Sequence, residues 1–243
     1  MIKIFIDFDG TITKGDLGDL FFEIFGGKAA LQAVKDYQSG LINAVECFTR
    51  EADACVMSAE GEAAEFIDQQ KIDPTFIDFV NFCNQHKDGE RQIKYFIVSD
   101  GLDYYIERIL QNNSLQNIPY FSNRVTFVER DNQIRLQLEF PYTDEECDQC
   151  ASCKRNHILT LSGDDDIIVY IGEGYSDFCP VKYADIVFAK DELQTHCQKE
   201  NISYNLYKNF KDVIVRLEEI LSKKIIRKRQ QAEFNRKEIL LAG

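Results

Sequence analysis

Two aspartates near the start of the chain have residue types and a spacing suited to catalysis. An apolar run over residues 2–6, rich in β-branched and aromatic side chains, ends abruptly at Asp7-Phe8-Asp9-Gly10-Thr11, as a buried strand does. Carboxylates at the C-terminal end of a strand lie where open α/β sheets bind ligands. At this spacing one carboxylate can attack phosphorus while the other serves as acid and base for the leaving group and water. A solvated turn is the alternative, because Asp and Gly are ordinary turn residues.

Two later strands also end in polar clusters, and a lysine lies between them in the sequence. The run at 93–101 ends in Ser99-Asp100-Gly101, and the run at 166–174 leads to Glu173 and Asp177, with Lys154 opening a helix between the two. Each residue alone has a structural explanation. Ser99 and Asp177 are suited to capping helices, and Lys154 to the surface, where Arg155 is its rival. Together they place a hydroxyl, a cation and two acids at or beside successive strand ends.

The pattern of apolar residues predicts the elements that must position these side chains. Residues 14–72 show only helical periodicity, with a helix end at Gly26-Gly27 and later helices near 28–38, 42–56 and 59–69,. Asp73-Pro74 opens another helix to about Gln85. Segments around Asp131-Asn132-Gln133 predict a hairpin, 184–190 a strand, and the chain from about Lys211 one long helix with a basic end.

Alternation of strands and helices predicts the fold class. Such alternation favours an α/β fold with a doubly wound parallel sheet that is covered on both faces. The helical block has no strand within it, so it reads as an all-helical domain inserted after the first strand. We therefore expect an α/β core over residues 1–13 and 73–243 and a helical cap over 14–72.

Charge and hydropathy restrict the partners of the chain. Its 243 residues carry 28 Lys and Arg against 41 Asp and Glu, a formal charge of −13, which opposes binding to nucleic acid. A phosphorylated substrate must therefore meet a local cation or a metal. No apolar segment approaches the roughly 20 residues that a membrane helix requires, and a strand beginning at residue 2 leaves no room for a signal peptide. We expect a cytoplasmic protein without a membrane partner, and the pattern does not indicate an oligomeric state.

Three of the eight cysteines form a cluster in the sequence. Cys147, Cys150 and Cys153 are separated by two residues each, a spacing found among metal ligands, and Cys179 or His157 is available as a fourth ligand. Zinc signatures more commonly consist of two separated pairs, and acidic residues precede this cluster. Free thiols or a disulfide are the favoured alternative to a structural metal.

Taken together, the motifs resemble those of the haloacid dehalogenase superfamily, in its phosphatase branch with a helical cap after the first motif. The resemblance rests on Asp7-Phe8-Asp9-Gly10-Thr11, on Ser99-Asp100-Gly101, on Lys154 and on Glu173 to Asp177, and it spans about residues 2–190. The family commonly has Asp where this chain has Glu173. The longer side chain puts direct ligation of a metal by that residue in question.

The resemblance implies a role for each matching residue. Asp7 would be the nucleophile that forms an aspartyl-phosphate, and Asp9 the general acid and base. Ser99 and the backbone N–H groups of Asp100 and Gly101 would hold the phosphoryl oxygens. Gly10 and Thr11 would line the substrate site, Lys154 would offset negative charge, and Asp16 lies where phosphoserine phosphatases have an acid that contacts the substrate amine. The cofactor would be Mg²⁺, held by Asp7, Asp9, Glu173 and Asp177.

The resemblance also implies a substrate class, a small phosphorylated metabolite. The stretches around Asp103, Cys150 and Phe178 resemble phosphatases of the methionine-salvage pathway that act on a hydroxyketo-methylthiopentenyl phosphate, and also the phosphocholine and phosphoethanolamine phosphatases. Arg50 is near, but out of register with, the arginine by which phosphoserine phosphatases bind the substrate carboxylate. Two other functions stay open: a phosphotransferase, and a phospho-aspartate module without turnover, against which the second acid Asp9 argues.

Overall fold

The protein is described by a computed structural model over residues 1–88, 91–145, 147 and 149–242, and it divides into two compact units. Unit 1 comprises Met1–Ile12, Ile72–Val98 and Lys154–Gly243, and unit 2 comprises Thr13–Lys71 and Ser99–Cys153. The helical segment expected over 14–72 belongs to unit 2 except for Ile72. Unit 2 also contains residues 99–153, which the sequence placed with the α/β core.

Packing explains why residues 99–153 associate with the helical segment. Met57 pairs with Ile134 across an antiparallel bridge, in which each residue's N–H donates to the other's carbonyl at 3.1 and 2.8 Å. The rings of Phe21 and Tyr105 lie 6.5 Å apart, and Arg108 forms an ion pair with Asp68 at 2.6 Å. These contacts join segments that are separated in the sequence, so local periodicity does not reveal them.

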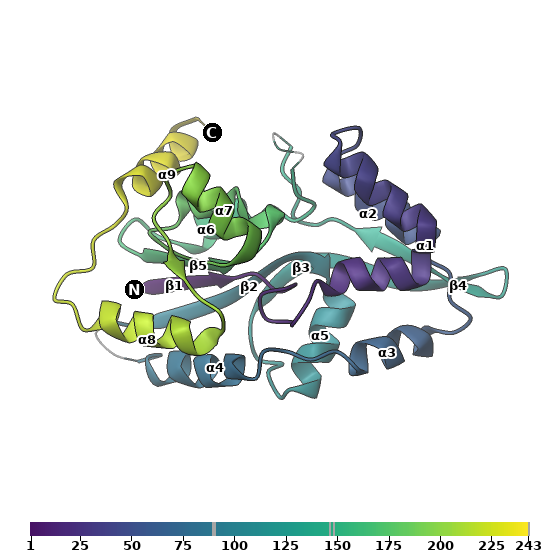
Figure 1. The fold of residues 1–243 in the computed structure, drawn as a ribbon, viewed down its shortest axis with the longest axis horizontal. Helices are drawn as coiled ribbons and strands as arrows, with labels where there is room; N and C mark the ends of the chain where they lie inside the picture. The colour runs from purple at the N-terminus through teal and green to yellow at the C-terminus, as the bar shows by residue number, and fades with distance from the viewer. Residues whose placement is uncertain (89–90, 146, 148, 243) are drawn as a thin grey trace. The chain divides into compact units, whose positions relative to one another are not determined.

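Among its described residues, unit 1 contains five parallel strands in the spatial order β2-β1-β5-β6-β7. Helices α4 and α8 cover one face of these strands, and α6 and α7 cover the other (Figure 1), as expected for a doubly wound sheet. The strands are β1 (Ile2–Ile6), β2 (Ile93–Leu102, whose last four residues belong to unit 2), β5 (Ile167–Gly172), β6 (Ile186–Ala189) and β7 (Asn205–Leu206). The helices are α4 (Thr75–Gln85), α6 (Lys154–Leu161), α7 (Asp191–Lys199) and α8 (Phe210–Leu221).

The central strands are buried on both sides, as continuous apolar runs predict. Ile4, Phe5 and Ile6 are fully buried. Phe210 of α8 packs against α4, with its ring centroid 4.8 Å from Phe76 and 5.1 Å from Phe79. Ile6 is level with Ile97 of β2 and Ile171 of β5, so the carboxyl ends of β1 and β5 lie at the same edge. This edge positions the candidate site.

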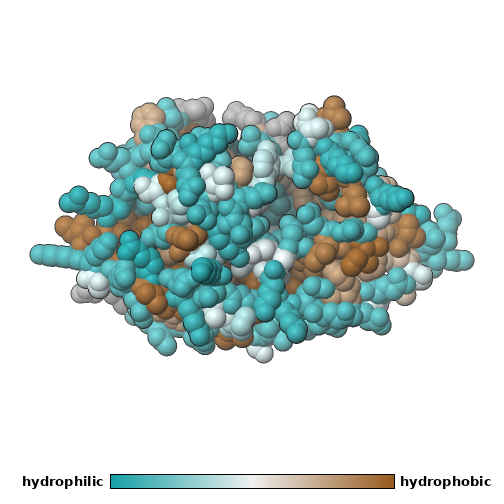
Figure 2. All heavy atoms as spheres, in the orientation of Figure 1, coloured by the Kyte–Doolittle hydropathy of each residue, from teal (hydrophilic) through white to brown (hydrophobic). Residues whose placement is uncertain are grey.

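Unit 2 combines the expected helices with the expected hairpin. Its elements are α1 (Leu17–Gln38), α2 (Ala44–Ala54), α3 (Glu60–Asp68), α5 (Asp103–Asn112), β3 (Tyr120–Arg130) and β4 (Gln133–Glu139). Helix α1 is two helices joined across a kink at Gly27, whose φ is 57°, close to the helix end that the glycine pair predicts. Asp131 and Asn132 have φ of 54° and 59°, the left-handed conformation of a tight hairpin turn. Hydrophobic side chains gather over α1 in Figure 2, the helix that exposes Leu20 and Ile24.

The prediction of one long C-terminal helix is wrong. Helix α8 ends at Leu221, and a separate helix α9 spans Gln230–Ala242. The Arg91 guanidinium donates to the carbonyls of Leu221, Lys223 and Lys224, and a continuing helix would need these acceptors for its own N–H groups. Within the described residues, we find no helix with the length and apolar character needed to cross a bilayer.

Candidate active site

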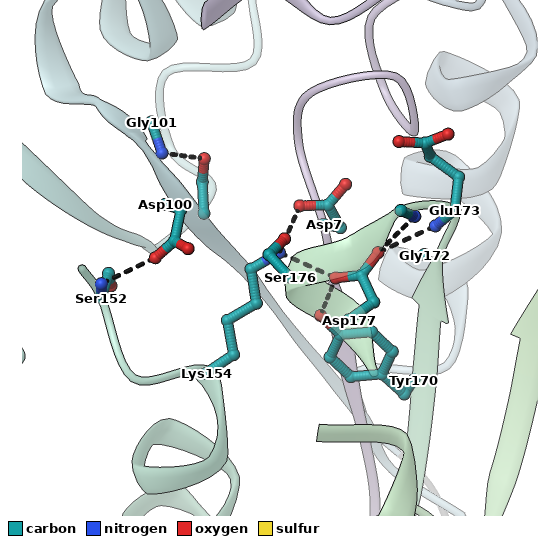
Figure 3. Close-up of polar contacts among 12 residues, drawn as sticks. Asp7, Asp100, Gly101, Ser152, Lys154, Tyr170, Gly172, Glu173, Ser176 and Asp177 are labelled. Carbon is teal, nitrogen blue, oxygen red and sulfur yellow. Dashed lines mark hydrogen bonds and ion pairs between the residues drawn. The ribbon is translucent and has the colours of Figure 1, made fainter. Parts of the chain in front are cut away.

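A buried lysine connects two of the acids that the sequence singled out. Lys154 Nζ donates to Asp7 Oδ1, to Asp177 Oδ1 and to Ser176 Oγ, each at 2.7 Å (Figure 3). The lysine is 1% exposed and Asp177 is fully buried. Burying these charges is costly unless each is paired. Lys154, and not its neighbour Arg155, therefore holds the position between the acids.

The fold of unit 1 brings these side chains together from three parts of the sequence. Asp7 directly follows β1, and its N–H donates to Ile171 O of β5 at 2.9 Å, so the chain stays against β5 for one residue beyond the strand. Lys154 is the first residue of α6. Asp177 ends the short 3₁₀ helix η1 (Tyr175–Asp177), which follows β5. Adjacent carboxyl ends of parallel strands thus create the cluster.

Asp177 is held by hydrogen bonds to both of its carboxylate oxygens. Its Oδ2 accepts from the N–H groups of Glu173 at 2.8 Å and Gly174 at 3.1 Å, and its Oδ1 accepts from Tyr170 Oη at 2.6 Å as well as from Lys154 (Figure 3). A Cβ at Gly172 would lie only 2.3 Å from Asp177 Oδ2. Glycine at that position is therefore a requirement of the buried carboxylate.

Burial and neighbouring acids change the ionisation of Asp7. Desolvation and the nearby Asp177 raise the pKa of the Asp7 carboxyl well above its usual range, while Lys154 lowers it and Asp9 adds a further increase. The charges of Asp177 and Asp9 thus oppose the ionisation of Asp7, and the Lys154 ammonium favours it. An additional cation near Asp7 would favour its ionised form, which is the nucleophilic one.

The loop after β1 contacts the loop after β5 at Gly10. Gly10 has a φ of 69°, a left-handed conformation that favours glycine, and a Cβ there would lie 2.9 Å from both Cδ and Oε1 of Glu173. The carboxyl group of Glu173 therefore lies directly against Gly10. The Lys190 ammonium, from the end of β6, donates to Gly10 O at 2.7 Å. Thr11 beside it is 2% exposed.

Asp9 lies in unit 1 beside Gly10, whereas Ser99, Asp100, Gly101 and Asp16 lie in unit 2. Ser99 Oγ accepts from Gly101 N at 2.9 Å. Asp100 Oδ1 accepts from Ser152 N at 2.6 Å (Figure 3). Asp16 caps α1, because its Oδ1 accepts from Asp19 N at 2.8 Å. Arg50 forms ion pairs with Glu46 and Asp36.

Three contact residues of unit 1 were not foreseen: Tyr170, Ser176 and Lys190. In the sequence, Tyr170 is one more side chain of a predicted buried strand, although its hydroxyl needs a partner when buried. Ser176 lies beside a motif acid, and Lys190 is the last residue of the strand predicted over 184–190. The place of Lys190 at the carboxyl end of a predicted strand was the signal that could have identified it. Its partner Gly10, however, is 180 residues away in the sequence.

The cysteines and the acids of the candidate site are the two groups of side chains that could bind a metal ion. All eight cysteines are free thiols, and Cys150 and Cys153 are buried. Among the residues that the structure describes, no group of three His, Cys, Asp or Glu side chains is arranged to hold a metal ion. The chemistry of the donors at Asp7, Asp9, Glu173 and Asp177 nevertheless suits a hard divalent cation, since all are oxygens and acids outnumber the nearby lysine.

Comparison with known proteins places the chain in a family. The model of the Putative Phosphatase family matches residues 2–213. A phosphatase from Bacillus mycoides that acts on 2-hydroxy-3-keto-5-methylthiopentenyl-1-phosphate is 28% identical over 227 residues, covering 92% of this chain and 99% of that protein. Its counterpart in Bacillus cereus is 29% identical with the same coverage.

Solved structures share the fold. A haloacid dehalogenase family hydrolase from Salmonella enterica serovar Typhi matches with a TM-score of 0.67 at 17% identity, over 92% of this chain and 72% of that one. Phosphoserine phosphatase, as an analogue of its phospho-aspartyl intermediate, matches with a TM-score of 0.62 at 16% identity, over 89% and 98%. The chain therefore belongs to the Putative Phosphatase family and is a phosphatase with the haloacid dehalogenase fold.

Proposed function

We propose that the protein hydrolyses a small phosphomonoester through an aspartyl-phosphate formed on Asp7. The observation that carries the proposal is the buried Lys154, which bonds to Asp7 and Asp177 at 2.7 Å. The ammonium favours the carboxylate form of Asp7, and it would offset the charge of an incoming phosphate dianion. Folding does not require this buried ion pair, because apolar side chains at the same positions would have a smaller desolvation penalty. The pair is therefore better explained by catalysis.

In this mechanism the other motif residues transfer protons and bind oxygens. Asp9 would protonate the leaving oxygen and then take a proton from the attacking water. Ser99, with the N–H groups of Asp100 and Gly101, would bind the phosphoryl oxygens. Asp177 would keep Lys154 in place, because both of its own oxygens are engaged by fixed donors. Asp16 would contact the substrate.

We further propose that the enzyme uses Mg²⁺, held by carboxylates among Asp7, Glu173 and Asp177 and by the backbone carbonyl of Asp9. When bound, the ion would supply a Lewis acid for the phosphoryl group. The proposal is supported by the raised pKa of Asp7, which reflects its burial and the Asp177 and Asp9 charges around it. Loss of activity with a chelator, restored by added Mg²⁺, is the direct check.

For the substrate, we propose the phosphorylated ketone of methionine salvage. The support is the pair of Bacillus relatives, which match nearly their full length at 28% and 29% identity. Phosphoserine, phosphocholine and phosphoethanolamine are the alternatives. Arg50 argues against phosphoserine, because it is paired with Glu46 and Asp36.

A panel of phosphorylated metabolites tests both substrate and reaction. The enzyme is expected to release inorganic phosphate from the methylthiopentenyl ester with a kcat/KM well above that for phosphoserine and phosphocholine. Adding an excess of glycerol as a competing acceptor separates hydrolysis from transfer. Free phosphate alone supports hydrolysis, whereas phosphorylated glycerol would identify a phosphotransferase.

A further inference from the structure

We infer that Lys190 and Tyr207 are positioning residues that hold the loop after β1 against the loop after β5, so that Glu173 faces Gly10 in one fixed arrangement. This inference rests on the proposed function, because it concerns the same candidate site. Neither residue belongs to a motif that suggested chemistry. Both are contributed by the chain beyond β6, which the sequence indicates only as supporting structure.

Lys190 reaches across the sheet edge to the first loop. It follows β6, and in the sheet β5 lies between β6 and β1. Its ammonium donates to Gly10 O at 2.7 Å and lies 5.4 Å from the ring centroid of Tyr207. The half-buried ammonium thus combines a charge-assisted hydrogen bond with a cation–π contact. A lysine whose role was only solubility would extend into water instead.

Tyr207 and the start of α7 hold the second loop. Tyr207 is 1% exposed, and its hydroxyl donates to Gly172 O at 3.2 Å. The N–H of Leu193 donates to Glu173 O at 2.7 Å. Together with Lys190, these donors satisfy the carbonyls of Gly10, Gly172 and Glu173. The Gly172 and Glu173 carbonyls lie at the end of β5 and the Gly10 carbonyl lies in the loop after β1, where the sheet provides fewer partners,.

The three hydrogen-bonded carbonyls belong to the two loops that meet where Glu173 lies against Gly10. Glu173 packs its carboxyl group onto Gly10, whose missing Cβ leaves the necessary space. Glutamate is one methylene longer than the aspartate common in the family, so the backbone spacing here decides where its oxygens lie. Lys190 fixes the Gly10 side of this spacing, and Tyr207 fixes the Gly172 side.

The electrostatic surroundings of Tyr207 place it beside the same acids. Burial raises the pKa of its phenol well above the usual range; the Thr11 side chain lowers the pKa, and the charges of Asp177, Asp7 and Glu173 raise it further. The hydroxyl therefore stays protonated at neutral pH and remains a hydrogen-bond donor. A phenol that senses all three acids is close enough for its displacement to disturb them.

Conservative variants test the inference. Lys190→Met keeps the length of the side chain without the charge, and Tyr207→Phe removes only the hydroxyl. Each is expected to lower kcat for an aryl phosphate about 10- to 100-fold, the usual effect of removing a supporting hydrogen bond at such a site, with KM changed less than threefold. Each should also reduce the rise in Tm that Mg²⁺ produces. Lys190→Arg should recover most of both effects.

Matched controls are available near the same elements. Lys199→Met removes an exposed lysine at the end of α7, and Tyr204→Phe removes a hydroxyl that accepts from Gln198 Nε2. Both should behave as the unmodified enzyme. Values of kcat and of the Mg²⁺-induced Tm rise within twofold of the unmodified enzyme for Lys190→Met and Tyr207→Phe would overturn the inference. The inference would also be overturned if the Tm of a variant without Mg²⁺ fell so far that unfolding by itself explained the lost activity.

The failure of this inference is distinguishable from failure of the proposed function. Near-normal turnover by Asp7→Asn would defeat the proposed function, whatever Lys190 does. An inactive Asp7→Asn together with an unaffected Lys190→Met would leave the proposed function standing and remove only the positioning role.

Discussion

Lys154 shows why single residues in this site depend on one another. Its ammonium is buried with two carboxylates and one hydroxyl as partners. Taking such charges out of water costs several kcal/mol per ion, which only close and complete pairing offsets. Removing Lys154 would therefore leave Asp7 and Asp177 buried without the ammonium that pairs them. The cluster is expected to act as a unit in both folding and catalysis.

Replacing Lys154 by Met tests this dependence. We expect turnover to fall at least 100-fold and the unfolding free energy at neutral pH to fall by about 3–5 kcal/mol, the cost of breaking a buried pair. The loss of stability should shrink as the pH is lowered, because Asp7, whose carboxyl pKa is raised by burial, becomes protonated. Urea denaturation of the variant and the unmodified protein at several pH values measures this difference in unfolding free energy.

The double variant Lys154→Met/Asp177→Asn provides the control. It should regain part of the stability, because one buried charge has been removed along with its partner, but no activity. Stability equal to that of the single variant would show that Lys154 and Asp177 do not act as a pair.

At this scale the sequence reveals acids and bases more readily than neutral partners. Asp7, Lys154 and Asp177 are recognisable because they occur in the order and strand context of a known set of phosphatase motifs. Tyr170 and Ser176 complete the same cluster, yet a tyrosine in a strand and a serine in a turn are ordinary. Lys190 was visible as a basic residue after β6, but its contact with Gly10 depends on strand order.

Among the elements, α2 carries a carboxyl group with an unusual environment. Glu51 is 4% exposed, and Cys47 Sγ lies 3.8 Å from its Oε2. Burial raises the pKa of Glu51 to about 8, and the charge of Asp19 contributes to the increase. At neutral pH the folded protein therefore holds a proton on Glu51 that the unfolded chain releases.

The sign of the resulting pH dependence follows from this proton. Between the unfolded pKa near ~4.3 and the folded value of about 8, the native state binds more protons, so stability falls as pH rises. Glu51→Gln should abolish that part of the slope and stabilise the protein at pH ~8 by on the order of 3 kcal/mol. Glu65→Gln, on the exposed face of α3, is the matched control. Urea midpoints that fall equally with pH in Glu51→Gln and the unmodified protein would contradict this explanation.

Local signals predicted most elements, and long-range contacts account for the errors. The turn at Asp131-Asn132 and the kink at Gly27 are encoded by residues that tolerate positive φ, so the sequence reveals them. The end of α8 is different. It depends on Arg91, which takes carbonyls 130 or more residues away, and no local pattern announces such a partner.

At the scale of the whole molecule, the path of the chain between the two units is informative. The chain passes from one unit to the other after Ile12, Lys71, Val98 and Cys153. Three of these four points lie beside residues that the sequence singled out: Thr11, Ser99 and Lys154. The motifs therefore coincide with the points where the chain leaves or enters unit 1. The hairpin of unit 2 was misassigned to the core because its partners, such as Met57, precede it by many residues.

The location of the phosphoryl group during turnover tests the central claim most directly. The Asp9→Asn enzyme, mixed with an aryl phosphate whose leaving group needs no proton, should form the intermediate and hydrolyse it slowly. Peptide mass spectrometry after rapid acid quenching is expected to find one phosphoryl group, on the peptide containing Asp7 and at that residue. The same experiment with Asp7→Asn should find none and release no phosphate. A phosphoryl group on another residue, or near-normal phosphate release by Asp7→Asn, would contradict the account.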